Sequence, residues 1–401
     1  MGMPPGLAIT LVLIAACTAF ALKPVRRPAP LSLVSYLMGL VFNEIPFAIF
    51  LYLVLPFTAL AFADEHSRSM AWGLDAYLLL VTAGLAYIWW RQQDAVNEVE
   101  DAVDVGGTHH WVYPYAEEHS PVLSKAPGTV RVLAAPFPFR RADVRRAGNI
   151  SYGNAGRRNL LDVYHHRDVP KDAPVLVYFH GGSFNSGNKR REGRPLMLRL
   201  ASRGWVCVSA NYRLRPKASF VDWMTDVKKV IAWAKDEGPE YGADPESVFV
   251  AGSSAGGHMA AVAGLTGNDP VFQKGFEDAD TSVVGFIGMY GYYGGLDGES
   301  VPASPLDYLK EDAPPAFLAH GNIDTVVKVE GARRFAARLG ENSKNPVTYV
   351  ELSGAQHGFD LLHSERMERV SDGIETWAAR VRHGTAQTTE GSISQSVRPI
   401  R

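Results

Sequence analysis

The chain has 401 residues, more than the roughly 250 to 300 residues at which a single hydrophobic core stops growing. We therefore expect one large domain plus a further region. Its 40 basic residues nearly balance 42 acidic residues, which excludes the whole-chain positive field that attracts nucleic acid. The two cysteines, Cys17 and Cys207, lie in different apolar segments. We interpret each as a small buried hydrophobe and expect no disulfide framework.

The first ninety residues are strongly apolar. The apolar segments are residues 7–22, 31–63 and 73–90. Each approaches or exceeds the roughly 20 apolar residues that cross a bilayer core. We therefore predict a transmembrane region over residues 1–91 with about three helices, the middle one kinked, and the membrane lipid bilayer as a partner. Glu44 lies close to Pro46 in the middle segment. We expect it to face a neighbouring helix or a break in its own and to fix helix packing.

The charges of the loops predict the membrane side. Lys23, Arg26 and Arg27 crowd the first loop, whereas the second carries Asp64, Glu65 and one arginine. The positive-inside rule then places the first loop and, with three spans, everything after residue 91 in the cytoplasm. Splitting the middle segment into two spans would place that part outside.

Two other interpretations of the N-terminus are weaker. A cleaved signal peptide would begin with basic residues, and MGMPPG has none. The residues before Cys17 resemble a lipobox, which would make Cys17 a lipid anchor, but the following TAFAL stays apolar. A membrane span therefore explains the first segment better than either alternative.

The rest of the chain changes character twice. Residues 92–142 are polar and dotted with proline, and we interpret them as a linker or cap. Residues 143–383 alternate apolar runs with amphipathic helical stretches, the first expected strand being residues 159–166. This pattern predicts an α/β fold with a mostly parallel sheet covered by helices on both faces. Residues 384–401 are polar, and we expect them to be disordered.

A candidate nucleophile follows the apolar run SVFVA. The sequence there reads GSSAG, and a GxSxG turn between a strand and a helix needs small residues two positions before and after the nucleophile. Ser254 has Gly252 and Gly256 at those positions, whereas Ser253 has alanines. The spacing therefore indicates Ser254.

A second strand, APVLVYFH, ends in a glycine-rich loop. An attacked ester carbonyl becomes an oxyanion that needs backbone N–H donors between small side chains. The candidates for this oxyanion hole are Gly181, Gly182, Ser183 and, after the nucleophile, Ala255. We interpret the preceding His180 as a residue that holds the loop.

Two further strand ends supply an acid and a base. A serine needs a base to take its proton and a carboxylate to orient that base. HGNID contains Asp324 and AQHGF contains His357, in the chain order Ser, Asp, His. His320 and His363 are rival bases that we interpret as structural. Asp360 is a weaker candidate acid because it follows the base.

These motifs together resemble the α/β-hydrolase superfamily, specifically the hormone-sensitive-lipase-like and related carboxylesterase group. The matching segments are HGGSFNSGNK, ANYRL, YGADPESVFVAGSSAGGHMA, HGNID and AQHGF. The sequence departs from the lipase-like HGGG at Ser183, and from the HGGxW of relatives similar to feruloyl esterases and kynurenine formamidases at Phe184. The arrangement of N-terminal membrane spans before such a domain resembles that of the isoprenylcysteine methylesterases.

The resemblance implies a membrane-anchored serine carboxylester hydrolase with no cofactor and no metal. The catalytic residues would be Ser254, Asp324 and His357, acting on small or lipidic esters. The alternatives are an amidase or acyltransferase on the same fold, an isoprenylcysteine-methylesterase-like activity, or a non-catalytic binding module. Residues 289–309 and the segment before Ile150 are candidate walls of the substrate pocket.

Overall fold

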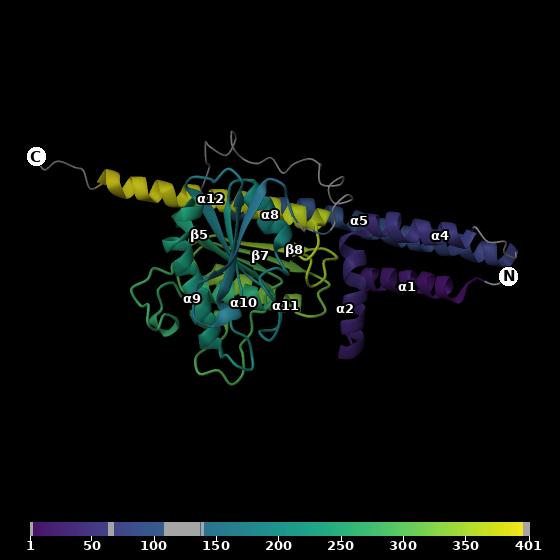
Figure 1. Cartoon of the computed structure of the whole chain (residues 1–401), viewed down its shortest axis with the longest axis horizontal. Helices are drawn as coiled ribbons and strands as arrows, with labels where there is room; N and C mark the ends of the chain where they lie inside the picture. Colours follow the sequence, from purple (N-terminus) through teal and green to yellow (C-terminus); the bar gives the residue numbers. More distant parts are fainter. Residues whose placement is uncertain (1–2, 63–67, 108–136, 138–139, 396–401) are drawn as a thin grey trace, which may run out of the picture.

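The computed structural model describes residues 3–62, 68–107, 137 and 140–395 (Figure 1). Its body is an eight-stranded sheet in the order β1-β2-β4-β3-β5-β6-β7-β8. The strands are β1 (Val144–Ser151), β2 (Leu160–His166), β3 (Ala173–Phe179), β4 (Val206–Ala210), β5 (Ala243–Ser253), β6 (Gly285–Met289), β7 (Ala316–Gly321) and β8 (Val347–Leu352). β1 and β2 run antiparallel to their neighbours and the other pairings are parallel. The predicted mostly parallel sheet is therefore confirmed.

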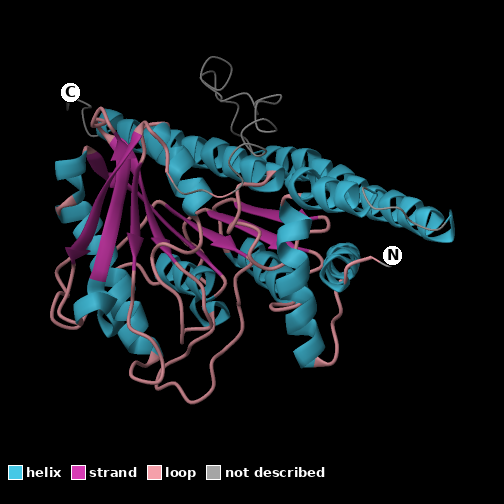
Figure 2. Ribbon diagram, turned by 45° about the vertical axis from the view of Figure 1, so that its right-hand side comes forward, coloured by secondary structure: helices cyan, strands magenta, loops and turns pink. Residues whose placement is uncertain are grey.

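Helices cover both faces of this sheet, as predicted (Figures 1 and 2). One face packs against α9 (Phe220–Asp236), α10 (Ala255–Leu265) and α11 (Val329–Asn342). The other packs against α8 (Arg194–Ser202), α12 (Glu365–Gln395) and the second half of α5 (Arg68–Gly107). Short 3₁₀ turns occupy Gly156–Asn159, Gly238–Tyr241, Pro270–Phe272 and Pro305–Tyr308. The central strands β3 and β4 are buried along their whole length because both faces are covered.

Strand β1 departs from the expected start of the sheet. We expected residues 159–166 to form the first strand. Strand β1 precedes them in the chain and pairs with β2. Its sequence, VRRAGNIS, lacks the apolar run by which buried strands are recognised, because it lies at the sheet edge and is mostly exposed. A register shift between Gly148 and Ile150 further interrupts its pattern.

Helix α5 corrects the expected linker. We predicted a linker or cap over residues 92–142, yet α5 continues without a break to Gly107. Its second half packs Ala95, Val99 and Val103 against the sheet and α12. The charged residues between these apolar positions made the stretch look like a linker. Of the remaining expected linker, residues 108–136, 138 and 139 lie outside the described residues.

The C-terminal tail also differs from the expectation of disorder over residues 384–401. Helix α12 continues to Gln395, and residues 396–401 lie outside the described part. A close approach between α12 and α5 depends on a glycine, since a Cβ at Gly373 would lie 2.4 Å from Val99 Cγ1.

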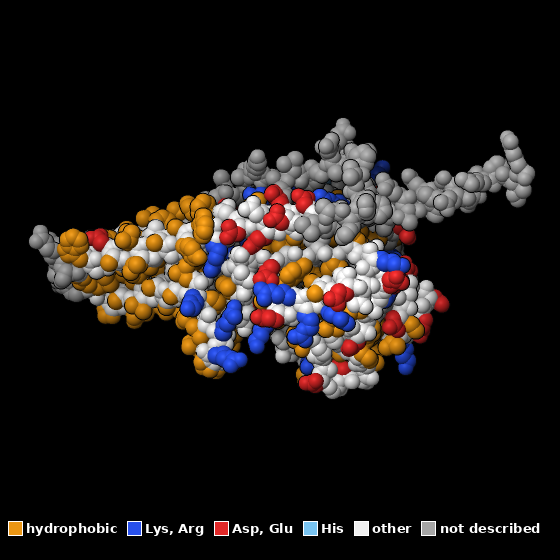
Figure 3. Space-filling model, turned by 180° about the vertical axis from the view of Figure 1, so that it is seen from behind, with side chains coloured by type: hydrophobic (Ala, Val, Ile, Leu, Met, Phe, Trp, Pro, Cys, Tyr) orange, Lys and Arg blue, Asp and Glu red, His pale blue; other side chains and the backbone are white. Residues whose placement is uncertain are grey.

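The N-terminal helices extend away from the body (Figures 1 and 3). They are α1 (Pro5–Leu22), α2 (Ala29–Glu44), α3 (Pro46–Ile49), a π-helical stretch (Phe50–Val54) and α4 (Leu55–Phe62), followed by the first half of α5. Two helices, α1 and α5, are long and apolar enough to cross a membrane, and α2 with α3–α4 forms a pair bent by 92°. The expected kink in the middle segment is thus a right-angled break at Ile45, and α2 lies across the end of the other N-terminal helices, next to the body (Figure 1).

A buried ion pair joins α2 to the body. Glu44, at the C-terminal end of α2, pairs with Arg366 of α12, and both side chains are fully buried. Ser364 Oγ and Asn43 Nδ2 each donate to the Glu44 carboxylate at 3.0 Å. Asn43 Nδ2 also donates to the backbone oxygen of Gly354 at 2.9 Å. The expectation that Glu44 lies at a helix break in a packing contact agrees with this geometry, and its partner is in the body.

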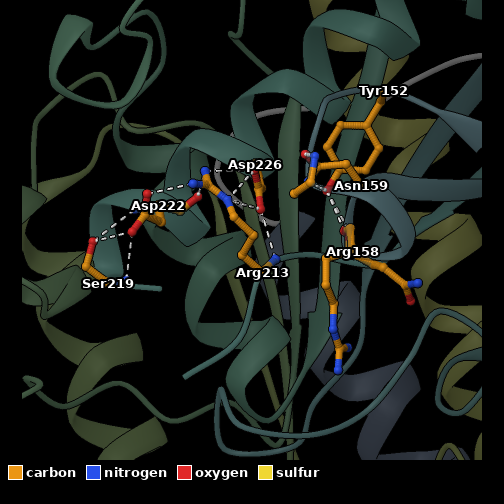
Figure 4. A network of polar contacts seen from close by, with 9 residues as sticks. Tyr152, Arg158, Asn159, Arg213, Ser219, Asp222 and Asp226 are labelled. Atoms are coloured by element: carbon orange, nitrogen blue, oxygen red, sulfur yellow. Dashed lines mark hydrogen bonds and ion pairs between the residues drawn. The ribbon is translucent and has the colours of Figure 1, made fainter. Parts of the chain in front are cut away.

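Polar contacts also fix the exit of β4 (Figure 4). The guanidinium of Arg213, from the ANYRL segment, donates to Asp226 at 2.9 Å and to Asp222 Oδ1 at 2.6 Å. Asp222 in turn accepts from the N–H of Ser219 at 2.9 Å and completes the capping box that begins α9. Arg213 therefore links the loop that follows β4 to helix α9.

We predict that Glu44→Ala lowers the free energy of unfolding by about 3–5 kcal/mol, because it leaves the buried Arg366 charge unpaired. Chemical denaturation of the full-length protein in detergent measures this change. Glu311→Ala is the matched control, since Glu311 pairs with Lys344 on the surface, where both side chains are mostly exposed. Equal unfolding midpoints for the two variants would contradict the assigned role of Glu44.

Candidate active site

Ser254 occupies a sharp turn between β5 and α10. Its backbone has φ 55° and ψ −116°, a conformation that non-glycine residues rarely adopt and that is often found at functional sites. A Cβ at Gly252 would lie 2.3 Å from the backbone of Gly256, and one at Gly256 would lie 2.0 Å from the oxygen of Phe179. Both flanking glycines are therefore required by contact with backbone atoms, which is the physical basis of the spacing that indicated Ser254.

The three predicted catalytic side chains lie in one hydrogen-bonded row. His357 Nε2 is 3.1 Å from Ser254 Oγ, and His357 Nδ1 is 2.7 Å from Asp324 Oδ2. Asp324 follows β7 and His357 follows β8, so the parallel strands bring them to the same edge of the sheet as the β5 turn. In this arrangement His357 can accept the Ser254 proton while Asp324 orients its ring.

Asp324 is held as a carboxylate. Burial by itself would raise its pKa, but the adjacent His357 and a contact with His320 outweigh burial and lower the pKa to about 2. Its second oxygen accepts the N–H groups of Val326 and Val327, each at 2.8 Å. The acid is therefore ionised and fixed in position throughout the neutral pH range.

The loop after β3 contains the predicted oxyanion donors and requires one correction. Among the described residues, no hydrogen bond uses the N–H of Gly182, Ser183 or Ala255. The N–H of Gly181, in contrast, donates to Glu192 Oε2 at 2.8 Å, so it is not free to bind an oxyanion. Gly181 contributes by its size instead, because a Cβ there would lie 2.9 Å from Ser254 Cβ.

Ser253 belongs to a separate buried network beneath the elbow. Its hydroxyl donates to Asp360 Oδ2 at 2.6 Å, and the same oxygen accepts from Tyr178 OH at 2.8 Å and from the Gly193 N–H at 3.1 Å. Tyr290 OH donates to the other carboxylate oxygen. The weaker candidate acid, Asp360, is thus committed to this network, and burial raises its pKa.

The rival histidines have other partners. His180 is fully buried, stacks on Tyr212 at 4.5 Å between ring centroids, and has its pKa lowered to about 4 by burial. His320 Nε2 lies 2.9 Å from the backbone oxygen of Val327 and 3.4 Å from Asp324 Oδ2, so it contacts the acid instead of Ser254. His363 contacts Glu368. These positions agree with the structural interpretation of all three.

Of the residues expected to line the substrate pocket, some contact the candidate site and others pack in the core. Within residues 289–309, the Tyr290 ring meets His357 edge-on at 4.5 Å, whereas Tyr293 stacks on Phe335 in the core. Phe184, where the sequence departs from HGGxW, is buried and stacks on Trp223 at 4.6 Å. The departure at Phe184 therefore concerns packing under the loop. The other candidate wall, the segment before Ile150, lies largely outside the described residues.

Two contacts of the base were missed by the sequence analysis. Tyr36 of α2 places its ring edge-on to His357, 6.1 Å between centroids. Gln356 Oε1 accepts the N–H of His357 at 2.9 Å and that of Thr325 at 2.7 Å, which links the base loop to the acid loop. Tyr36 was hidden in a segment interpreted as a span, although the small and polar residues on its face of α2, including Ser32 and Gly39, form a helical stripe.

The sheet order, the turn at Ser254 and the residues at the ends of β7 and β8 define the class of α/β-hydrolases. The sequence model of the BD-FAE family matches residues 161–293. A probable carboxylic ester hydrolase, LipM of Mycobacterium tuberculosis, is 35% identical over 94% of this chain and 93% of its own length. Esterase LipC of the same organism is 38% identical over 65% of this chain and 71% of its own length.

The chain therefore belongs to the carboxylic ester hydrolases of the α/β-hydrolase superfamily. Two solved structures share the fold. A truncated carbohydrate esterase from gut microbiota matches with a TM-score of 0.53 and 18% identity, over 61% of this chain and 99% of its own. Esterase 2 of Thermogutta terrifontis, phosphoramylated by tabun, matches with a TM-score of 0.50 and 24% identity, over 59% of this chain and 93% of its own.

We predict that Glu192 makes stability depend on pH. Burial, followed by repulsion from Asp360, raises the Glu192 pKa from 4.5 to about 7. The folded protein therefore holds this proton more tightly than the unfolded chain. This contribution to the free energy of unfolding is fully present below about pH 4.5 and is lost as the pH rises to about 7.

Glu192→Gln keeps an acceptor for the Gly181 N–H but cannot ionise. Denaturant unfolding of both proteins at several pH values should show that the free energy of unfolding of the variant rises relative to that of the wild type between about pH 4.5 and pH 7. Above about pH 7 the difference between the two proteins should be constant. Parallel curves from pH 4 to 8 would contradict the assignment.

Proposed function

We propose that this protein is a membrane-anchored serine carboxylester hydrolase in which Ser254 is the nucleophile, His357 the general base and Asp324 the orienting acid. The observation that carries the proposal is the row of contacts from Ser254 Oγ through His357 to Asp324, at 3.1 and 2.7 Å. The backbone conformation of Ser254 supports it, because the turn presents this side chain at the edge of the sheet.

The first half of the reaction forms an acyl-enzyme. Ser254 Oγ attacks the ester carbonyl carbon while its proton moves to His357 Nε2. The carbonyl oxygen becomes an oxyanion, which the N–H groups of Gly182, Ser183 and Ala255 bind. When the C–O bond to the alcohol breaks, His357 returns the proton to the leaving oxygen.

The second half releases the acid. Water attacks the acyl carbon and gives a proton to His357, and the same donors bind the second oxyanion. Collapse of this intermediate breaks the bond to Ser254 Oγ, which takes back the proton. The negative charge of Asp324 stabilises the His357 cation that forms in each half.

We predict that Ser254→Ala abolishes labelling by a fluorophosphonate probe and lowers kcat by about 10⁴-fold or more. Ser253→Ala is the matched control, one residue earlier, and should still be labelled because its hydroxyl contacts Asp360 instead of His357. In-gel fluorescence of the full-length variants measures this. Labelling that persists in Ser254→Ala and disappears in Ser253→Ala would reverse the assignment.

The distribution of apolar side chains supports the membrane anchor. Large hydrophobic side chains are exposed along the N-terminal helices, as on α5, where Leu79 and Leu80 are 71% and 72% exposed (Figure 3). Exposed aromatic residues occur at both ends of this stretch, with Trp72 at one end and Trp90 at the other. The two residues are 18 positions apart in the helix, about 27 Å, which is close to the roughly 30 Å thickness of the hydrocarbon core of a bilayer.

The position of the basic loop supports a cytoplasmic catalytic domain. The loop with Lys23, Arg26 and Arg27 leaves α1 at its end nearest the body, and Arg26 Nη2 donates to the backbone oxygen of Asn322 at 3.4 Å. The basic loop and the body are therefore on the same side of the helices. By the positive-inside rule that side is the cytoplasm.

We predict that a C-terminal green fluorescent protein fusion is fluorescent in cells, while a C-terminal alkaline phosphatase fusion is inactive, because phosphatase requires export. A phosphatase fusion after Asp64, in the second loop, is the control and should be active. Phosphatase activity at the C-terminus would show that the catalytic domain lies outside the cytoplasm.

A further inference from the structure

A cavity of about 460 Å³ lies between the first loop and the start of α11. Its lining residues are Arg26, Arg27, Asp324, Thr325, Lys328, Val329, Glu330 and Arg334. The loop residues come from the connection between α1 and α2, and the rest come from the acid loop and α11. The cavity therefore spans the junction between the N-terminal helices and the catalytic domain.

The lining carries a net positive charge. Four cationic side chains face two carboxylates, a net charge of +2, and the Asp324 carboxylate is directed at His357 and at its own loop. Among the described residues, none of these four cations forms an ion pair with an acid, whereas Arg333 and Arg338 on the same helix pair with Glu351 and Glu341. The N-terminus of the 14-residue α11 adds a partial positive charge. An anion would be attracted to this cavity.

The cavity is also adjacent to the catalytic row. Asp324 lines it through the acid loop, and Asp324 in turn contacts His357, which contacts Ser254. Arg26 and Arg27 lie in the loop after α1, one of the two helices able to cross a membrane. In the membrane arrangement proposed above, these arginines lie at the level of the lipid headgroups, where basic residues attract anionic lipids.

We propose that this cavity binds the phosphate-bearing headgroup of an anionic lipid in the adjacent leaflet and so presents a carboxylic ester of that lipid to Ser254. This inference rests on the proposed function, since it names the substrate class of the same site. It assigns Arg26, Arg27, Lys328 and Arg334 as the residues that select for negative charge.

The test compares two lipids with the same acyl chains in mixed micelles, phosphatidylglycerol and phosphatidylcholine, using the full-length protein. We expect the wild type to have the higher kcat/KM for phosphatidylglycerol. The double variant Lys328→Gln/Arg334→Gln should lower the ratio of the two kcat/KM values by about tenfold, since each basic residue near such a surface contributes a few-fold. Arg26→Gln/Arg27→Gln should have the same effect.

The double variant Arg333→Gln/Arg338→Gln is the matched control, because it also removes two positive charges from α11 but outside the cavity. Its ratio should equal that of the wild type. A wild-type ratio near one, or an unchanged ratio in Lys328→Gln/Arg334→Gln, would overturn the proposal. The ratio also compensates for any general loss of activity in a variant.

Two further arms separate the alternatives. Hydrolysis of p-nitrophenyl butyrate by the wild type but not by Ser254→Ala tests the proposed function independently of the cavity. Inorganic phosphate tests a soluble anion as the occupant. If phosphate inhibits butyrate hydrolysis through Lys328 and Arg334 while the two lipids are hydrolysed equally, the site takes a soluble anion and the lipid assignment is wrong.

Discussion

The buried ion pair between Glu44 and Arg366 is the contact on which the arrangement of the two parts of this protein depends. Two charges without exposure to water are tolerated only when they neutralise each other and their remaining hydrogen-bonding groups are occupied. Here Ser364 and Asn43 complete the shell of Glu44. Because Arg366 lies in the first turn of α12, which follows the His357 loop, the same contact that docks α2 also anchors the segment that carries the base.

The docking of α2 gives the base part of its surroundings. The ring of His357 has edge-on contacts with Tyr290, from the body, and with Tyr36, from α2. The N-terminal helices thus contribute a wall of the candidate site in addition to their place in the membrane proposal. A catalytic domain cut away from residues 1–107 would lose this wall and would expose the face of the sheet that α5 covers.

The local features of the fold and site could be predicted from the sequence. The glycines around Ser254 have a steric cause that acts over two residues, so the sequence records it directly. Apolar runs likewise indicated the buried parallel strands. Gly181 was assigned wrongly as a donor because its N–H is engaged by Glu192, eleven residues away, and no short motif contains that contact. Tyr36 and the second half of α5 were missed for the same reason: their partners are distant in the chain.

The unbroken course of α5 has a mechanical consequence. A helix of 40 residues is about 60 Å long and resists bending, unlike a flexible tether. With its first half in a bilayer and its second half packed on the sheet, the enzyme would be held at one height and one orientation above the membrane. Encounters with a membrane-borne ester would then be a search in two dimensions, governed by the number of molecules per unit of membrane area and by lateral diffusion.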